Sequence, residues 1–242
     1  MKETAIITGA SKRIGRAIAE HLAINGWGVI VHYNNSDKEA NDLVSNFKQK
    51  YPDQYFASVQ ANLSNEKEIG KLIPKVISES GGCQLLINNA SVFNSAYILE
   101  TSNELFEKQL DVNLKAPFIL MRDFALHCKT GNIINFVDTR ISVNKTNYAA
   151  YSLSKKGLWD LTKMAALEFA PDIRVNAIAP GVTLPPQDED ETYLSKLAEK
   201  IPMKRPGGIE PILKSIDFIL ENSYLTGQLL FADGGENLGL NE

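Results

Sequence analysis

Short apolar runs alternate with amphipathic segments along almost the whole chain. Seven apolar runs are typical of buried strands, and they span Thr4 to Thr8, Gly28 to Tyr33, Gln54 to Gln60, Gln84 to Asn88, Asn132 to Val137, Arg174 to Ile178 and Gln228 to Phe231. Six helical segments lie between them, and they span Arg13 to Asn25, Ser36 to Lys50, Ser64 to Ser80, Asn103 to Lys129, Ala149 to Ala170 and Ile209 to Asn222. This alternation predicts an α/β fold, a single-domain Rossmann-type three-layer α/β/α sandwich with a seven-stranded parallel sheet.

Local signals predict three details of the helices. Gly26 follows the first helix at a position where a glycine commonly ends one. Ser64, with Lys67 and Glu68 beyond it, predicts the N-cap of the third helix. Pro74 lies inside that third helix and predicts a kink.

Length and composition favour one domain. The chain has 242 residues with 44% hydrophobic content, and we expect residues 1–242 to share one core. One stretch breaks the alternation, from Pro180 to Glu191, where three prolines, a glycine and an acidic run at 188–191 occur. We predict a surface loop there, within a substrate loop that spans residues 180–208. It follows the sixth strand, at the edge where open α/β sheets bind ligands, so it is a candidate lid. A solvated acidic loop without ligand contact is the alternative for the four acids.

Charge and cysteine usage narrow the class of partner. The formal net charge is -4 and no run of Lys or Arg occurs, so we expect a small-molecule substrate and neither nucleic acid nor a membrane. The N-terminal residues lead straight into the first apolar run, and no apolar run has membrane-spanning length, which predicts a cytoplasmic protein. Cys83 and Cys128 fit no metal-ligand spacing, so we expect inert thiols and no metal site.

Two glycines bracket the turn between the first strand and the first helix. Gly9 and Gly15 let backbone N–H groups and the helix N-terminus approach a diphosphate without a Cβ in the way. The fingerprint is imperfect because Arg13 stands where a middle glycine is usual, and an ordinary strand-to-helix turn is the alternative. The position of the turn, at the first βα junction, favours a dinucleotide.

The end of the second strand indicates which dinucleotide is bound. Proteins that prefer NAD place an acid there to bind the ribose hydroxyls, whereas residues 31–36 include none. Lys12, with Asn35 and Ser36, is expected to bind a 2′-phosphate, so we predict NADPH as the cofactor. The alternative for Asn34 and Asn35 is a simple turn pair.

A second group of residues carries the chemistry. Tyr151 and Lys155 are four residues apart on one face of a predicted helix, so the ammonium is expected to lie beside the phenol and ease its ionisation. Asp138 precedes Tyr151 by thirteen residues. The Tyr–Lys pair predicts a proton donor.

Together these motifs resemble the short-chain dehydrogenase/reductase superfamily over nearly the whole chain. The resemblance rests on Thr8 to Gly15, Asn88-Asn89-Ala90, Asn113, Tyr151 to Lys155, Pro180-Gly181 and Asp233-Gly234-Gly235. Within the superfamily the chain is most similar to the pteridine reductases, through Lys12-Arg13, His32-Tyr33, Ser36, the run Asn88 to Phe93, and Val137-Asp138.

The resemblance implies a role for each site residue. Catalysis falls to Asp138, Tyr151, Lys155 and Asn113, with Asn113 as the proton-relay asparagine and Lys155 also holding the nicotinamide ribose. Cofactor binding falls to Gly9, Lys12, Arg13, Ile14, Gly15, His32, Tyr33, Asn35, Ser36, Asn62, Leu63, Asn89, Ala90, Ser91, Tyr151, Lys155, Pro180 and Gly181. Substrate binding falls to Arg13, Ser91, Phe93, Asp138, Tyr151 and Thr183.

Two of these residues have a structural alternative, and two others depart from the family. Phe93 is expected to stack on a flat pterin ring against the nicotinamide, or else to be a core aromatic. Arg13 is expected to reach the cofactor phosphates and the pterin, or else to be a surface arginine. Asn35 stands where pteridine reductases often have arginine, and Asn62 replaces an Asp that accepts from the adenine amino group. The family also implies a homotetramer, in which the helices at 103–129 and 149–170 pack across one dyad and the C-terminal strand packs across another.

Asp138 occupies the family position of a serine that donates to a carbonyl substrate. An ionised carboxylate there repels the oxyanion that grows during ketone reduction, and it favours a ring nitrogen that gains a proton. Thr139 or Ser142 is the alternative hydroxyl. We therefore predict NADPH-dependent reduction of the C=N bonds of dihydropterin, biopterin or folate-like substrates. The alternatives are a carbonyl reductase of the 3-oxoacyl-carrier-protein or sugar type, and a non-catalytic NADPH-binding regulatory protein.

Overall fold

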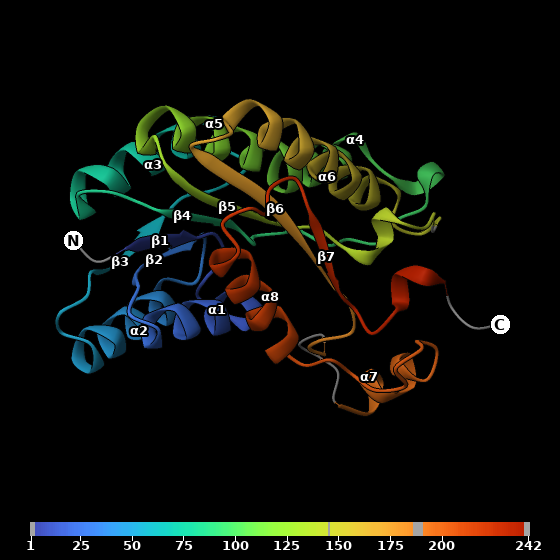
Figure 1. Ribbon diagram of the computed structural model, residues 1–242. Helices are drawn as coiled ribbons and strands as arrows, with labels where there is room; N and C mark the ends of the chain where they lie inside the picture. Colours follow the sequence, from blue (N-terminus) through green and yellow to red (C-terminus); the bar gives the residue numbers. More distant parts are fainter. Residues whose placement is uncertain (1–2, 145, 186–190, 240–242) are drawn as a thin grey trace.

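The computed structural model describes residues 3–144, 146–185 and 191–239. Its centre is a sheet of seven parallel strands in the order β3-β2-β1-β4-β5-β6-β7 (Figure 1). The strands are β1 (Thr4–Ile7), β2 (Gly28–Tyr33), β3 (Phe56–Gln60), β4 (Leu85–Asn88), β5 (Gly131–Phe136), β6 (Ile173–Pro180) and β7 (Leu229–Ala232). The strand order reverses between β1 and β4, which is the point where open α/β sheets bind their ligands.

Helices cover both faces of this sheet (Figure 1). One face carries α1 (Arg13–Ile24), α2 (Asp37–Lys50) and α8 (Glu210–Glu221). The other face carries α3 (Glu66–Ser80), α5 (Ala116–Cys128) and α6 (Ala149–Phe169), with α4 (Asn103–Leu110) leading into α5. The short helix α7 (Glu191–Ala198) lies apart from these layers, near the carboxyl ends of the strands.

Successive residues of each strand face opposite cores, as β geometry requires. Ile7, Val31 and Ile87 pack in the core beneath α1, α2 and α8. Ile6 and Leu86 pack in the core beneath α3, α5 and α6. Because strands buried on both faces have continuous apolar sequences, the positions of β1, β2 and β4 were predictable.

The predicted fold class is confirmed, but one predicted helix is wrong. The segment from Asn103 to Lys129 is not a single helix, because a π-helical turn, Asp111–Lys115, separates α4 from α5. The cap predicted at Ser64 is also wrong. The side chain of Asn65 caps α3, and its Oδ1 accepts from the N–H of Lys67 at 3.1 Å.

Three other details concern the helix ends and the predicted substrate loop. Gly26 lies just beyond α1 with φ +91°, which confirms the predicted glycine at that end. Helix α3 continues through Pro74, and the kink there stays a prediction. Helix α7 forms within the segment predicted as substrate loop, while residues 186–190, with most of the acidic run, lie outside the described residues.

Within the part of the chain that the structure describes, no helix has the length and hydrophobicity to cross a membrane. The same residues contain no cluster of three side chains suited to a metal ion. Cys83 and Cys128 are both free thiols, and Cys83 is buried. The candidate functional groups gather instead where β1, β2, β4, β5 and β6 end.

Candidate active site

The turn after β1 is held in a form that only glycine permits at two positions. Gly9 has φ +64°, and a Cβ added to Gly15 would lie 2.2 Å from the carbonyl oxygen of Gly9. The side-chain amide of Asn89 donates to the carbonyls of Thr8, at 2.9 Å, and Gly9, at 3.3 Å. Asn89 therefore ties the end of β4 to the turn, as expected of a residue beside the cofactor.

His32 fixes the same turn from the end of β2. Its Nδ1 accepts from the N–H of Gly9 at 3.1 Å, and its Nε2 lies 3.1 Å from the carbonyl of Ala61. Burial lowers the pKa of His32 to about 4, so the ring is neutral and carries its proton on Nε2. The side chain of His32 is 1% exposed and both nitrogens are used within the protein, so its ring does not face a cofactor, and the predicted contact of this residue stays a prediction.

The N-terminus of α1 supplies donors for an anion. The first N–H groups of a helix have no partner inside it, and here the N-cap residue Lys12 makes no side-chain cap and the first turn contains no acid. Arg13 and Ile14 open the helix and line a cavity of about 310 Å³ together with Tyr151 and Lys155. This donor set suits the diphosphate of a dinucleotide.

Some of the residues expected around the adenosine ribose are exposed, and others already form hydrogen bonds within the protein. Asn35 is exposed, and the hydroxyl of Tyr33 donates to Asp37 at 2.7 Å. Asn62 is exposed, but its Oδ1 already accepts from the N–H of Ser64 at 3.0 Å. Leu63 is buried in the core, so its side chain does not face a cofactor.

Tyr151 and Asp138 form the centre of the site. The hydroxyl of Tyr151 donates to Oδ2 of Asp138 at 2.8 Å. Burial, and then the charge and hydrogen bond of Asp138, raise the pKa of Tyr151 well above its usual value, while Arg140 and Ser91 act in the opposite direction. Tyr151 therefore keeps its proton at neutral pH, as a proton donor must.

Lys155 lies over the Tyr151 ring, on the side that its spacing predicted. Its Nζ donates to the carbonyl of Phe136 at 2.8 Å and lies 5.9 Å from the centre of the Tyr151 ring. The pKa of the phenol is raised and the cation that acts to lower it is Arg140, so an effect of Lys155 on the ionisation of Tyr151 stays a prediction. Burial lowers the pKa of Lys155 itself to about 8.

Asp138 accepts hydrogen bonds from its own loop. It precedes the 3-10 helix Thr139–Ile141 and accepts from the N–H of Arg140 at 2.8 Å and from the guanidinium of Arg140 at 3.3 Å. The alternative hydroxyls do not reach Tyr151, since Thr139 bonds to Asp138 and Ser142 donates to the carbonyl of Thr139. The hydroxyl of Ser91 is the other hydrogen-bonding side chain beside the phenol, and its own hydrogen is donated to Oδ1 of Asn113.

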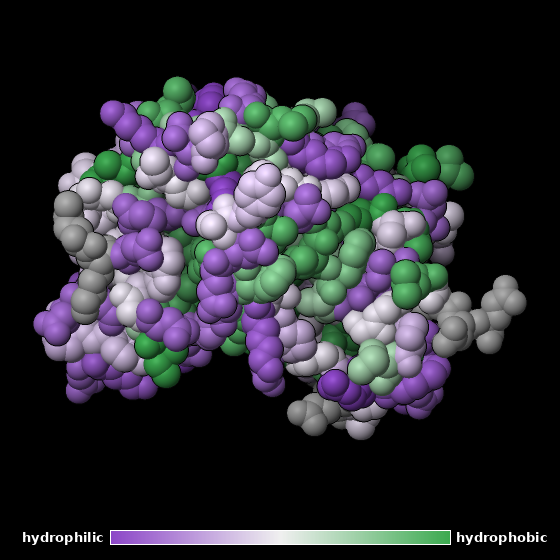
Figure 2. Space-filling view, viewed as in Figure 1, coloured by the Kyte–Doolittle hydropathy of each residue, from purple (hydrophilic) through white to green (hydrophobic). Residues whose placement is uncertain are grey.

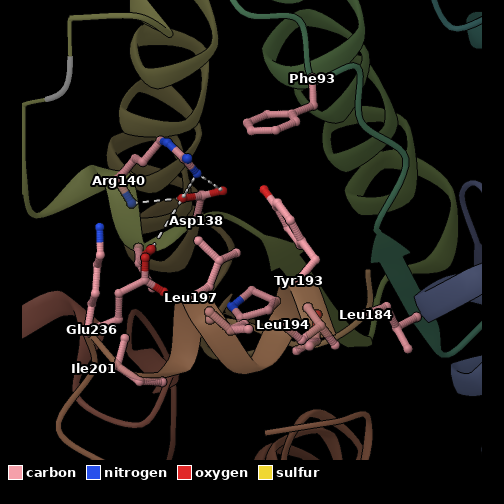
Figure 3. Close-up of a pocket in the computed structure, with 15 residues that line it drawn as sticks. Phe93, Asp138, Arg140, Leu184, Tyr193, Leu194, Leu197, Ile201 and Glu236 are labelled. Atoms are coloured by element: carbon pink, nitrogen blue, oxygen red, sulfur yellow. Dashed lines mark hydrogen bonds and ion pairs between the residues drawn. The ribbon is translucent and has the colours of Figure 1, made fainter. Parts of the chain in front are cut away.

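Three further residues, which the sequence did not indicate, form an aromatic wall with Phe93 beside Asp138. Tyr148 stacks on Phe93 with ring centres 4.5 Å apart, and the guanidinium of Arg140 lies over both rings at 4.7 and 5.1 Å from their centres. Tyr193 of α7 points toward Asp138 and Phe93 across the pocket (Figure 3). Phe93 is 50% exposed, so the core alternative for this residue is wrong.

Asn113 lies in the π-helical turn with its side chain fully buried. Its Oδ1 accepts from the hydroxyl of Ser91 and the N–H of Val92, while its Nδ2 donates to the carbonyl of Val92 and the hydroxyl of Ser154. All four bonds are within the protein. The side chain therefore positions the loop after β4, and the proposed proton relay stays a prediction.

The substrate side of the site is a cavity of about 370 Å³ between Asp138 and α7 (Figure 3). Thr183, Pro180 and Gly181 line both this cavity and the adjoining one that contains Tyr151. The outer wall of the 370 Å³ cavity is formed by Leu184, Tyr193, Leu194, Leu197, Lys200, Ile201 and Glu236. Arg13 is exposed, and its guanidinium donates to the carbonyl of Leu184 at 3.4 Å.

Comparison with known proteins gives one family and two kinds of relative. A family model described as enoyl-(acyl carrier protein) reductase matches residues 9–237. The 3-oxoacyl-[acyl-carrier-protein] reductase FabG of Staphylococcus epidermidis is 31% identical over 97% of this chain and 99% of its own length. Glucose 1-dehydrogenase 2 of Bacillus subtilis is 33% identical over 98% of this chain and 95% of its own length.

The solved structures point to another group of enzymes. FolM alternative dihydrofolate reductase 1 from Brucella canis, complexed with NADP, superimposes with a TM-score of 0.91 at 32% identity, over 99% of this chain and 96% of its own. The Brucella suis protein of the same name, also in complex with NADP, has a TM-score of 0.90 at 31% identity, over 98% of this chain and 96% of its own. Both kinds of relative are thus about equally similar in sequence.

Proposed function

The chain belongs to the short-chain dehydrogenase/reductase family and uses NADP, and we propose that it is a reductase of pterins that reduces a C=N bond. The cofactor supplies the hydride. The N-terminus of α1 would hold the diphosphate, and Lys155 would hold the nicotinamide ribose. Tyr151 would give the ring nitrogen its hydroxyl proton, which it donates to Asp138 in the free protein.

One observation carries this proposal: a carboxylate occupies the place of a hydroxyl donor. Carbonyl reduction is helped by donors that face the developing oxyanion. The carboxylate of Asp138 accepts the hydrogen bond of Tyr151 and has no hydrogen to donate, and neither Thr139 nor Ser142 replaces it. A pterin presents N–H groups that a carboxylate accepts and a ring nitrogen that takes a proton.

Arg140 modifies the electrostatic part of this argument. Its guanidinium lies 3.3 Å from Asp138 and balances the charge, so repulsion of an oxyanion is weaker than the sequence alone suggested. Arg140 does not change the hydrogen bonding, in which Asp138 accepts and has no hydrogen to donate. With Tyr151 donating and Asp138 accepting, the pair suits a substrate that offers both N–H groups and a basic nitrogen.

The aromatic wall supports a flat substrate. Phe93 and Tyr148 stack with their planes 8° apart, and Phe93 borders both cavities. A planar heterocycle can stack on such a surface with little loss of side-chain entropy. The structural similarity to the FolM proteins, whose names state dihydrofolate reductase, supports the same class of substrate.

The experiment is a panel of substrates with purified protein and NADPH. We expect oxidation of NADPH with 7,8-dihydrobiopterin or dihydrofolate, little with an acetoacetyl thioester or a sugar lactone, and loss of turnover in Tyr151→Phe. Turnover of the thioester but of no pterin would overturn the proposal.

A carbonyl reductase of the 3-oxoacyl type is the second candidate. It is favoured by the FabG relatives and by the apolar side chains of Leu194, Leu197 and Ile201, which suit an acyl chain. A non-catalytic NADPH-binding protein is disfavoured, because the Tyr151–Asp138 pair and buried Lys155 are assembled at one site.

A further inference from the structure

An ion pair spans the two helices that flank the end of β2. Nζ of Lys12 lies 2.8 Å from Oε1 of Glu39, and the two side chains are 45% and 43% exposed. Lys12 is the N-cap residue of α1, and Glu39 belongs to the first turn of α2. The pair therefore lies at the N-termini of two helices, near the end of β2, where the adenosine ribose of a dinucleotide binds in this kind of fold.

This contact changes the expectation drawn from the sequence. Residues 31–36 contain no acid, from which the sequence predicted that nothing near the 2′-phosphate would oppose it. In the folded chain Glu39 reaches the cation expected to bind that phosphate. In dinucleotide-binding folds an acid in this region favours NAD and a cation accommodates the phosphate of NADP. Here both are present, and each neutralises the other.

Two neighbouring arginines are engaged elsewhere, while Lys38, next to Glu39 on α2, also acts on the Glu39 carboxylate. The guanidinium of Arg13 donates to the carbonyl of Leu184 at 3.4 Å, toward the substrate cavity. Arg16 pairs with Glu20 at 2.8 Å on α1. Asp37, the other acid in the first turn of α2, accepts from Tyr33 at 2.7 Å and from Asn41 at 3.0 Å. Lys12 and Glu39 thus form the ion pair that joins the N-termini of α1 and α2.

We propose that Glu39 is a specificity-determining residue that limits the preference of this chain for NADPH over NADH. A 2′-phosphate has to draw Lys12 away from Glu39, and it then lies close to an unpaired carboxylate. NADH has no such phosphate and leaves the ion pair intact. The proposal concerns the cofactor alone and does not depend on which substrate is reduced.

Direct binding measurements test this proposal. Dissociation constants of NADPH and NADH are measured by calorimetry for the wild type, Glu39→Gln, Lys12→Gln and the double variant. An exposed ion pair alters an equilibrium by about two- to fivefold, and we expect Glu39→Gln to tighten NADPH binding by about that factor and to change NADH binding by less than about twofold. In the Lys12→Gln background the same substitution should change NADPH binding by less than about twofold.

Glu20→Gln is the matched control, because Glu20 forms an ion pair of the same length with Arg16 on α1, with both partners 48% exposed. The ratio of the two dissociation constants should not change in this variant. Equal effects of Glu39→Gln on NADPH and NADH, or no effect on NADPH, would overturn the proposal. An undiminished effect in the Lys12→Gln background would also overturn it, since Glu39 would then not act through Lys12.

Discussion

Asp138 and Arg140 are the charged residues that shift the pKa of Tyr151, and Lys155 on the same helix is not among them. The phenol donates to Asp138, and Arg140 is the cation whose charge lowers the pKa that burial and Asp138 raise. Lys155 is bonded to a backbone carbonyl instead. Two charged residues of one short loop therefore control the proton donor of a helix that follows it.

Replacing Arg140 tests whether this loop sets the reactivity of Tyr151. We expect Arg140→Gln to lower kcat by about tenfold with little change in KM, because a charged hydrogen-bond partner of Asp138 is lost and the pKa of Tyr151 rises further. Steady-state kinetics with the best substrate of the panel measures the change, and Arg140→Lys should recover part of it. Arg16→Gln, on an exposed ion pair, is the control. A change in KM alone would show that Arg140 binds substrate without acting on Asp138.

His32 gives the stability of the fold a pH dependence. Its folded pKa of about 4 lies below its unfolded value of 6.5, so the unfolded chain binds the proton more readily. The contribution is complete above pH 6.5 and is lost as the pH falls through 4, which amounts to about 3 kcal/mol. Urea denaturation at several pH values measures this. Between pH 6.5 and pH 4 and below, we expect the unfolding free energy of the wild type to fall by about 3 kcal/mol more than the unfolding free energy of His32→Gln. Parallel pH profiles would contradict this.

At the scale of elements, the π-helical turn between α4 and α5 is the device that brings Asn113 to the loop after β4. An ordinary helix repeats its register without interruption, whereas one extra residue in the turn shifts the following side chains. The four hydrogen bonds of Asn113 then fix Ser91, Val92 and Ser154. The periodicity of the sequence continues through this region, so a single helix was predicted.

Removing the side chain of Asn113 should destabilise the protein. Asn113→Ala leaves buried partners of Val92 and Ser154 without hydrogen bonds, and we expect the unfolding free energy to fall by about 2 kcal/mol. Asn25→Ala, which removes exposed bonds to His21, should cost less than about 0.5 kcal/mol. Denaturant titration compares the two variants. Equal and small effects would show that the turn does not depend on Asn113.

At the scale of the whole molecule, exposed apolar side chains are the candidate contact surfaces of the predicted homotetramer. On α4, α5 and α6 they are Phe106, Phe118, Leu153, Met164 and Leu167, each more than a third exposed. Figure 2 shows a second apolar area in the middle of one face, over the region of β6 and β7. Phe218 of α8 and Phe231 of β7 are also exposed. Two such areas fit the two dyads of the predicted homotetramer.

The assembly has a direct test in light scattering after size exclusion. We expect a mass four times that of the 26.7 kDa chain, and half of that value for Leu153→Glu with Met164→Glu. Ile24→Glu alters an equally exposed apolar residue on α1 and should leave the mass unchanged. A monomeric wild type would contradict the predicted tetramer.

Much of the fold could be predicted because buried parallel strands have apolar sequences. The Gly9–Gly15 turn and the Tyr151–Asp138 pair could be predicted because each depends on a fixed spacing. Arg140 and Tyr148 could not, since their contacts with Phe93 arise only when the loops after β4 and β5 meet. Glu39 was missed for the same reason, because its partner Lys12 lies 27 residues away on another helix.

The central claim is that Asp138 selects a substrate with nitrogen at the reacting bond. The most direct test is the ratio of kcat/KM for 7,8-dihydrobiopterin to kcat/KM for an acetoacetyl thioester, measured with NADPH in the wild type and in Asp138→Ser. We predict a ratio well above one in the wild type and a fall of about a hundredfold or more in the variant, because the serine restores a donor for a carbonyl oxygen. A wild-type ratio below one, or a ratio that the substitution leaves unchanged, would contradict the claim.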